Sequence, residues 1–188
     1  MRYTEKNLSD ISFWRDSGSI ENYANSLLRY CEKEIDLKIS VSNLSSTPRC
    51  AYRGNNKFLI ELPKPQDHYI DSVNEEKDIL ARKVFLKHEL AHIIFSDFTL
   101  FNDHHSAAGT SFHFLWNALE DVRIENLFGK KFSGANDSFF EIQDMYFNKS
   151  KKAIENSNTR KKHNQMFVTQ QHMFYFSISK TSDTKIKT

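Results

Sequence analysis

The hydrophobic positions of the chain follow two different periods, which predict an early sheet accompanied by helices. In residues 19–34 apolar side chains recur at steps of three and four, which predicts an amphipathic helix. Apolar and polar residues alternate over 37–41, which predicts a strand. Two short apolar runs, 50–52 and 57–62, flank the turn-forming residues 54–56, a pattern typical of a β-hairpin.

Longer segments with helical periodicity follow the hairpin. We expect helices at 74–95 and 111–128, separated by a loop at 96–109, with Gly129 as a stop signal. Residues 138–156 have a weaker helical pattern. This order of elements predicts an α+β fold, in which a small early sheet packs beside helices.

Composition narrows the class of protein. The 188 residues include 16 Phe and 7 Tyr, which is enough aromatic area for a core. A net charge of +2 disfavours nucleic acid as a partner. Two cysteines, Cys31 and Cys50, cannot form a four-cysteine zinc site and favour a reducing compartment. Because we find neither a signal-peptide core nor 18 consecutive apolar residues, we expect a cytoplasmic protein without a membrane partner.

One segment, His88-Glu89-Leu90-Ala91-His92, has the pattern H-E-x-x-H. Four residues advance a helix by about 6 Å and by little more than one turn, so both imidazoles face one side. They can therefore bind one Zn²⁺, and Glu89 can take a proton from a zinc-bound water. Chance alone predicts about 0.02 such motifs in a chain of this composition. The surrounding helix is apolar on most sides, and a metal would supply the partners that buried histidines need.

A catalytic zinc site needs a third protein ligand, and the second long helix offers two acids. Leu119, Val122 and Phe128 mark an apolar face of that helix, and Glu120 and Asp121 lie within it. We rank Glu120 first and Asp121 second. The alternative is that both acids are solvated, with Arg123 and Glu125 as neighbours in ion pairs.

Residues around the metal are also expected to orient its ligands. A ligating histidine usually donates its second ring N–H to a carboxylate. The candidates for this acceptor are Asp121, Glu125 and Asp97. His113, seven residues before Glu120, is a candidate for stabilising the oxyanion of a tetrahedral intermediate.

These motifs resemble the gluzincin branch of the zincin metallopeptidases. Segments 88–97 and 117–125 are similar to a group of bacterial and large-phage proteins in which a peptidase-like domain precedes a von Willebrand A domain. The resemblance implies a zincin fold and a peptide or protein substrate. It implies one Zn²⁺ held by His88, His92 and Glu120, with Glu89 as the general base.

The same resemblance implies that the strand near 58–62 is the sheet edge on which an extended peptide lies. The chain departs from these proteins in one respect and from thermolysin-like enzymes in another. It has no Asp-x-Ser-x-Ser motif of a von Willebrand A domain, and Ile124 stands where thermolysin-like enzymes have an acid. The choice between Glu120 and Asp121 therefore stays open.

We expect residues 1–130 to form the zincin-like peptidase domain and residues 131–188 a Lys-rich, helical or irregular extension. The leading hypothesis is a zinc metallopeptidase. The alternative is a catalytically inactive, zinc-stabilised module for binding or phage assembly. If the protein derives from a phage, we expect it in the virion or the host cytoplasm. The sequence does not predict the oligomeric state.

Overall fold

A computed structural model describes residues 8, 10–42, 47–64, 75–98 and 110–144, with backbone alone at 110–114. The chain forms two compact units, Met1–Phe101 and Asn102–Thr188. Within the described residues, the first unit holds a sheet, the short 3-10 helix η1 (Phe13–Arg15) and two α-helices, and the second holds further helices. The predicted α+β class is confirmed, whereas the zincin fold stays a prediction. The predicted division after residue 130 also stays a prediction, because residues 145–188 lie outside the described part.

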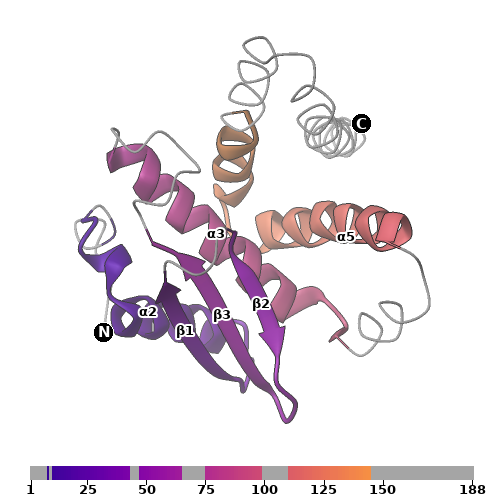
Figure 1. The fold of residues 1–188 in the computed structure, drawn as a ribbon, viewed down its shortest axis with the longest axis horizontal. Coiled ribbons are helices and arrows are strands. Elements are labelled where there is room, and N and C mark those ends of the chain that lie inside the picture. The colour runs from indigo at the N-terminus through magenta and orange to yellow at the C-terminus, as the bar shows by residue number, and fades with distance from the viewer. Residues whose placement is uncertain (1–7, 9, 43–46, 65–74, 99–109, 145–188) are drawn as a thin grey trace. The chain divides into compact units, whose positions relative to one another are not determined.

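The first unit is built on a three-stranded sheet of β1 (Asp36–Ser42), β2 (Arg49–Tyr52) and β3 (Lys57–Pro63). Its order is β1-β3-β2, with β3 parallel to β1 and antiparallel to β2 (Figure 1). The predicted strand and hairpin are confirmed. The expectation that the strand near 58–62 forms an edge is wrong, because β1 pairs with the side of β3 that the hairpin leaves open.

The hairpin turn depends on three successive residues with positive φ. Gly54, Asn55 and Asn56 have φ of 82°, 50° and 56°, a backbone region that Gly and Asn tolerate better than other residues. Lys57 N–H donates to the Gly54 carbonyl over 2.9 Å, and Arg53 N–H donates to the Lys57 carbonyl over 2.8 Å. The turn thus sets the register of β2 against β3.

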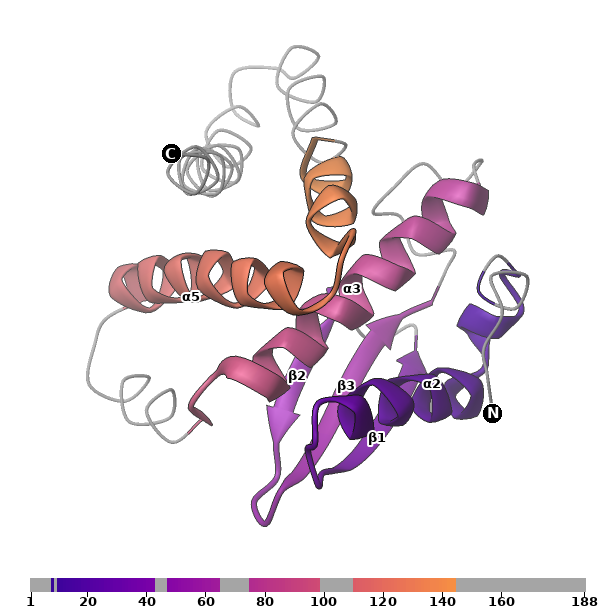
Figure 2. The same ribbon diagram turned by 180° about the vertical axis from the view of Figure 1, so that it is seen from behind.

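Helices α2 (Ser17–Tyr30) and α3 (Glu75–Phe95) cover the same face of the sheet, as the two opposite views show (Figures 1 and 2). The register places Ile39, Ile60 and Cys50 side by side across the three strands. Ile39 and Ile60 are buried. The core of this unit therefore lies between the sheet and the two helices, which are the helices predicted at 19–34 and 74–95.

Side chains of α2 cover the outer edge of β1. Ile39 N–H donates to the Glu21 carboxylate over 3.0 Å, and Val41 N–H donates to Ser17 Oγ over 3.2 Å. Glu21 also pairs with Lys38. Two backbone donors that an added strand would need are therefore already bound.

Arg82 ties α3 to the end of β3. Its side chain is only 4% exposed, and its guanidinium donates to the carbonyl oxygens of Pro63 and Lys64. The guanidinium also lies 6.0 Å from the centre of the Phe85 ring. A buried guanidinium is tolerated where hydrogen bonds compensate its charge, and here the bonds from Nη1 and Nη2 fix α3 to the end of β3.

The second unit contains α5 (Thr110–Lys131) and a helical segment at 135–144. The helix predicted at 111–128 is confirmed, but it passes through Gly129. A side chain at Gly129 would collide with the side-chain amide of Asn136. Phe128 and Phe139 pack edge to face, with ring centroids 6.2 Å apart. Gly129 therefore permits close packing of the two helical segments and does not end the helix.

No helix within the described ranges combines the length and the apolar character needed to cross a membrane.

Candidate metal centre

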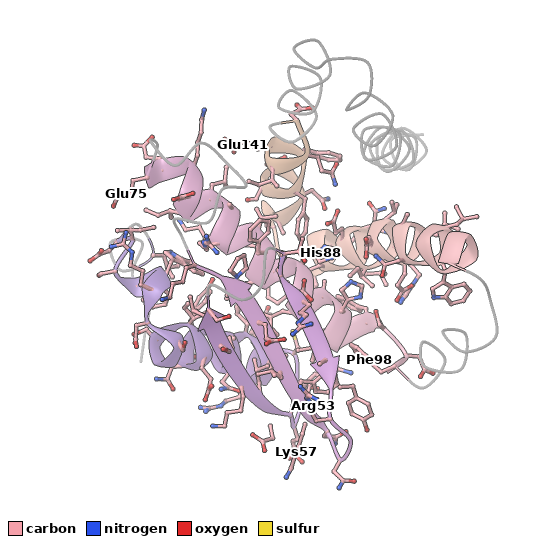
Figure 3. All side chains as sticks on the ribbon, in the orientation of Figure 1. Arg53, Lys57, Glu75, His88, Phe98 and Glu141 are labelled. Carbon is pink, nitrogen blue, oxygen red and sulfur yellow. The ribbon has the colours of Figure 1, made fainter. Side chains whose placement is uncertain are left out.

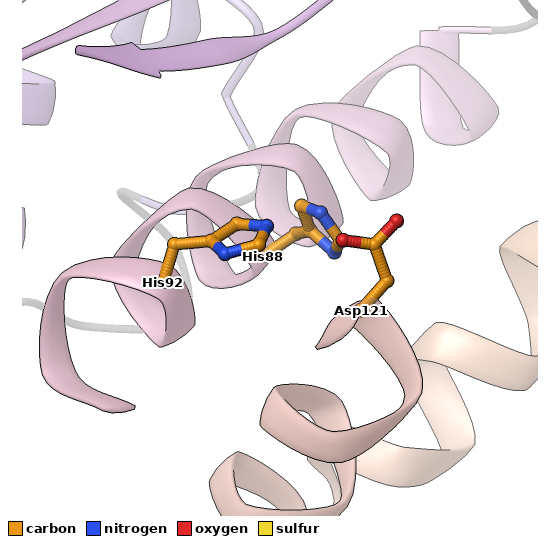
Figure 4. Close-up of side chains that lie close together, drawn as sticks. All are labelled: His88, His92 and Asp121. Atoms are coloured by element: carbon orange, nitrogen blue, oxygen red, sulfur yellow. The ribbon is translucent and has the colours of Figure 1, made fainter. Parts of the chain in front are cut away.

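His88 and His92 lie one turn apart on α3, as the H-E-x-x-H spacing predicts. Their ring centroids are 4.9 Å apart, with an interplanar angle of 81° (Figure 4). Both side chains are partly exposed, whereas the flanking Leu90 and Ala91 are fully buried. The helix thus places two imidazoles together at the margin of a buried core.

Glu89 is the other polar group of the motif, and it is 4% exposed. Its charge acts on Cys50 of β2. Burial, and secondly the negative charge of Glu89, raise the pKa of the Cys50 thiol above its usual range. Because α3 contacts β2, the buried Glu89 carboxylate lies close enough to Cys50 for its charge to act on the thiol.

One hydrogen-bonding partner of His92, Ser96, was not among the residues singled out from the sequence. His92 Nδ1 lies 3.0 Å from Ser96 Oγ, within hydrogen-bonding distance. Asp97, the candidate next to Ser96, is exposed. Serine four residues after a helical histidine lies on the same face, so the spacing alone could have indicated Ser96.

An aromatic cluster joins the segment after α3 to the hairpin. The ring centroids of Tyr52 and Phe58 are 5.1 Å apart, and that of Phe98 lies 5.9 Å and 5.1 Å from them. Figure 3 labels Phe98, just beyond the end of α3. Tyr52 is partly exposed at 36%. These contacts hold the end of the His-bearing helix against the edge strand β2.

In the second unit the two adjacent acids of α5 have different partners. Both carboxylate oxygens of Glu120 accept hydrogen bonds from Arg123, over 2.7 and 2.6 Å. Asp121 Oδ2 accepts a hydrogen bond from Asn117 Nδ2 over 3.1 Å. The ion pair considered as an alternative for Glu120 is thus present.

Other candidates of α5 have different surroundings. Glu125 accepts a hydrogen bond from Gln143 over 3.1 Å, which links α5 to the segment 135–144. His113 lies on α5, and the structure describes only its backbone. Leu119, expected on the apolar face, is 48% exposed, whereas Val122 and Phe128 are buried. The expected position of Leu119 is therefore wrong, because the buried face of α5 runs through Ala118 and Val122.

Among the described residues, His88 and His92 of α3 and, in the second unit, Asp121 of α5 are of the types that could hold a metal ion. Each offers one ligand atom: the histidines offer an imidazole nitrogen (Figure 4) and Asp121 offers a carboxylate oxygen. Two imidazole nitrogens and one carboxylate oxygen are a donor set that zinc accepts. Which of Asp121 and Glu120 would complete this set stays a prediction.

Comparisons with known proteins give no relative: no family model, no curated protein and no solved structure matches the chain. The resemblance to gluzincins therefore depends on segments 88–97 and 117–125 alone. What the protein does has to be inferred from its donor atoms and from the buried Glu89.

Proposed function

We propose that the protein is a zinc-dependent metallopeptidase, in which His88, His92 and Asp121 hold the metal and Glu89 is the general base. The observation that supports it most directly is the pair of imidazoles 4.9 Å apart on α3, with a buried carboxylate between them in sequence. Zn²⁺ bound by such a set lowers the pKa of a bound water to about 7 and polarises a carbonyl.

Asp121 is a better third ligand than Glu120 because of their hydrogen bonds. If a metal were bound by Glu120, two short, charge-assisted hydrogen bonds between Glu120 and Arg123 would be broken. One oxygen of Asp121 instead accepts a hydrogen bond from the Asn117 amide, and this bond orients the carboxylate. An outer partner of this kind is typical of metal-binding carboxylates.

Glu89 has the chemistry of a general base. It accepts a proton from the attacking water while the water oxygen bonds to the carbonyl carbon of the substrate. It then returns this proton to the amide nitrogen, and the C–N bond breaks to release an amine and a carboxylic acid. Burial of Glu89 keeps other water from competing for the carboxylate.

We further propose that an extended peptide substrate pairs with β2. The two edges of the described sheet are β1 and β2, and Glu21 and Ser17 already bind backbone donors of β1. β2 carries Cys50, whose thiol lies within the electrostatic influence of Glu89. A peptide added to this edge would lie beside the base.

The test is hydrolysis of a mixed library of quenched fluorescent peptides by the zinc-loaded protein. Glu89→Gln is expected to keep the zinc and to lose hydrolysis, because the amide cannot accept the proton. Glu76→Gln, in the exposed first turn of the same helix, is the matched control and is expected to retain hydrolysis. If the zinc-loaded wild type hydrolyses no peptide, the inactive zinc-binding module is the correct interpretation.

A further inference from the structure

Ser96 makes two contacts with His92. It is the first residue after α3, and its backbone N–H donates to the His92 carbonyl over 2.8 Å, closing the last turn. Its hydroxyl oxygen lies 3.0 Å from His92 Nδ1. The backbone contact holds Ser96 in place, so the hydroxyl meets the ring at a defined position.

From this geometry we infer that Ser96 is a positioning residue, which holds His92 in the tautomer that binds metal through Nε2. This inference deepens the function proposed above and rests on it. A neutral imidazole has one N–H and one lone pair. Because Ser96 lies within hydrogen-bonding distance of Nδ1, Nε2 is the ring nitrogen that would bind a metal. Nε2 offers its lone pair when Nδ1 carries the proton and donates it to Ser96 Oγ.

The hydroxyl of Ser96 thus takes the role that a carboxylate usually has beside a ligating histidine. Asp97 is next in the chain, but its side chain is exposed. Loss of the hydroxyl leaves Nδ1 without this acceptor and lets the ring adopt the other tautomer. Zinc binding would then have to return His92 to the first tautomer, and the free energy that this requires would weaken the zinc affinity.

The first measurement uses the metal-free protein. Long-range ¹H–¹⁵N NMR spectra report which ring nitrogen of His92 carries the proton. We expect a proton on Nδ1 in the wild type and a mixture of tautomers in Ser96→Ala. Ser96→Thr and Ser96→Val have nearly the same shape and differ in the hydroxyl, so Thr is expected to behave as the wild type and Val as Ala. Ser26→Ala, which removes a hydroxyl bonded to the Asn22 carbonyl on α2, is the control and should change nothing.

The second measurement is the zinc dissociation constant, by competition with a chelator. Ser96→Ala and Ser96→Val are expected to bind zinc about 10- to 100-fold more weakly, as is usual when an outer partner is lost. Unchanged tautomer and unchanged affinity in both variants would overturn the role of Ser96. If the wild type binds no zinc, the proposed function fails, whereas a tautomer that still depends on the hydroxyl would uphold the positioning of His92.

Discussion

The buried carboxylate of Glu89 on α3 acts on the thiol of Cys50 on β2. Together with burial, which is the larger cause, its negative charge raises the pKa of that thiol. The relationship joins the helix that carries the H-E-x-x-H motif to the edge strand on which we expect the substrate to lie. It also gives the stability of the protein a defined dependence on pH.

The first prediction concerns alkaline pH. Below about pH 8.5 the Cys50 thiol is neutral in both the folded and the unfolded chain, so it contributes nothing to the pH dependence. Above that pH the unfolded thiol ionises while the folded one stays neutral. The free energy of unfolding should then fall by about 1.4 kcal/mol per pH unit, until the folded thiol ionises as well.

Urea unfolding of the zinc-free, reduced protein between pH 7.5 and 9.5 measures this slope. Cys50→Ala should lower stability by a constant amount and should remove this part of the pH dependence. An equally steep decline in Cys50→Ala would show that the thiol of Cys50 is not its source.

The second prediction concerns Arg82. Arg82→Met keeps much of the side-chain volume but removes the donor from the buried carbonyl of Pro63 and from the partly buried carbonyl of Lys64. We expect a loss of about 2–4 kcal/mol in the free energy of unfolding. Lys83→Met, at the next position of the same helix and less buried, is the control and should cost less than about 1 kcal/mol. Equal stability of the two variants would contradict the role of Arg82 in fixing α3 to β3.

The third prediction separates the two edges of the sheet. Glu21→Ala removes the acceptor of the Ile39 N–H and should lower the free energy of unfolding by about 1 kcal/mol. Because the substrate is expected on β2, KM for a peptide substrate should not change. Glu34→Ala, an exposed acid beyond α2, is the control for loss of charge. A raised KM in Glu21→Ala alone would place the substrate on β1.

Local spacing predicted the features that depend on neighbouring residues. The alternation in β1, the turn at Gly54 and the one-turn separation of His88 and His92 all follow from the period of the backbone. The central place of β3 could not be predicted in this way. Alternation shows which face of a strand is buried, but not which strands lie on either side of it.

Which of two adjacent acids binds a metal, and whether a charged residue is buried, depends on the partners of the side chains. Hydrophobic periodicity does not reveal these partners. Glu120 and Asp121 differ through Arg123 and Asn117, each three or four residues away on α5. Arg82 is buried because the carbonyls that bind it come from the distant end of β3. Ser96 was missed because a carboxylate was expected beside His92, although a hydroxyl at the same helical spacing can accept the same proton.

The most direct measurement is the zinc affinity of the full chain, compared between Asp121→Asn and Glu120→Gln. The two variants remove one charge each from adjacent positions of α5. We predict that the wild-type chain binds one zinc ion. Asp121→Asn should weaken the zinc affinity by more than the roughly 10- to 100-fold that loss of an outer partner costs. Glu120→Gln should change the zinc affinity little. Zinc affinity that falls in Glu120→Gln and survives in Asp121→Asn, or a wild type that binds no zinc, would contradict the proposed centre.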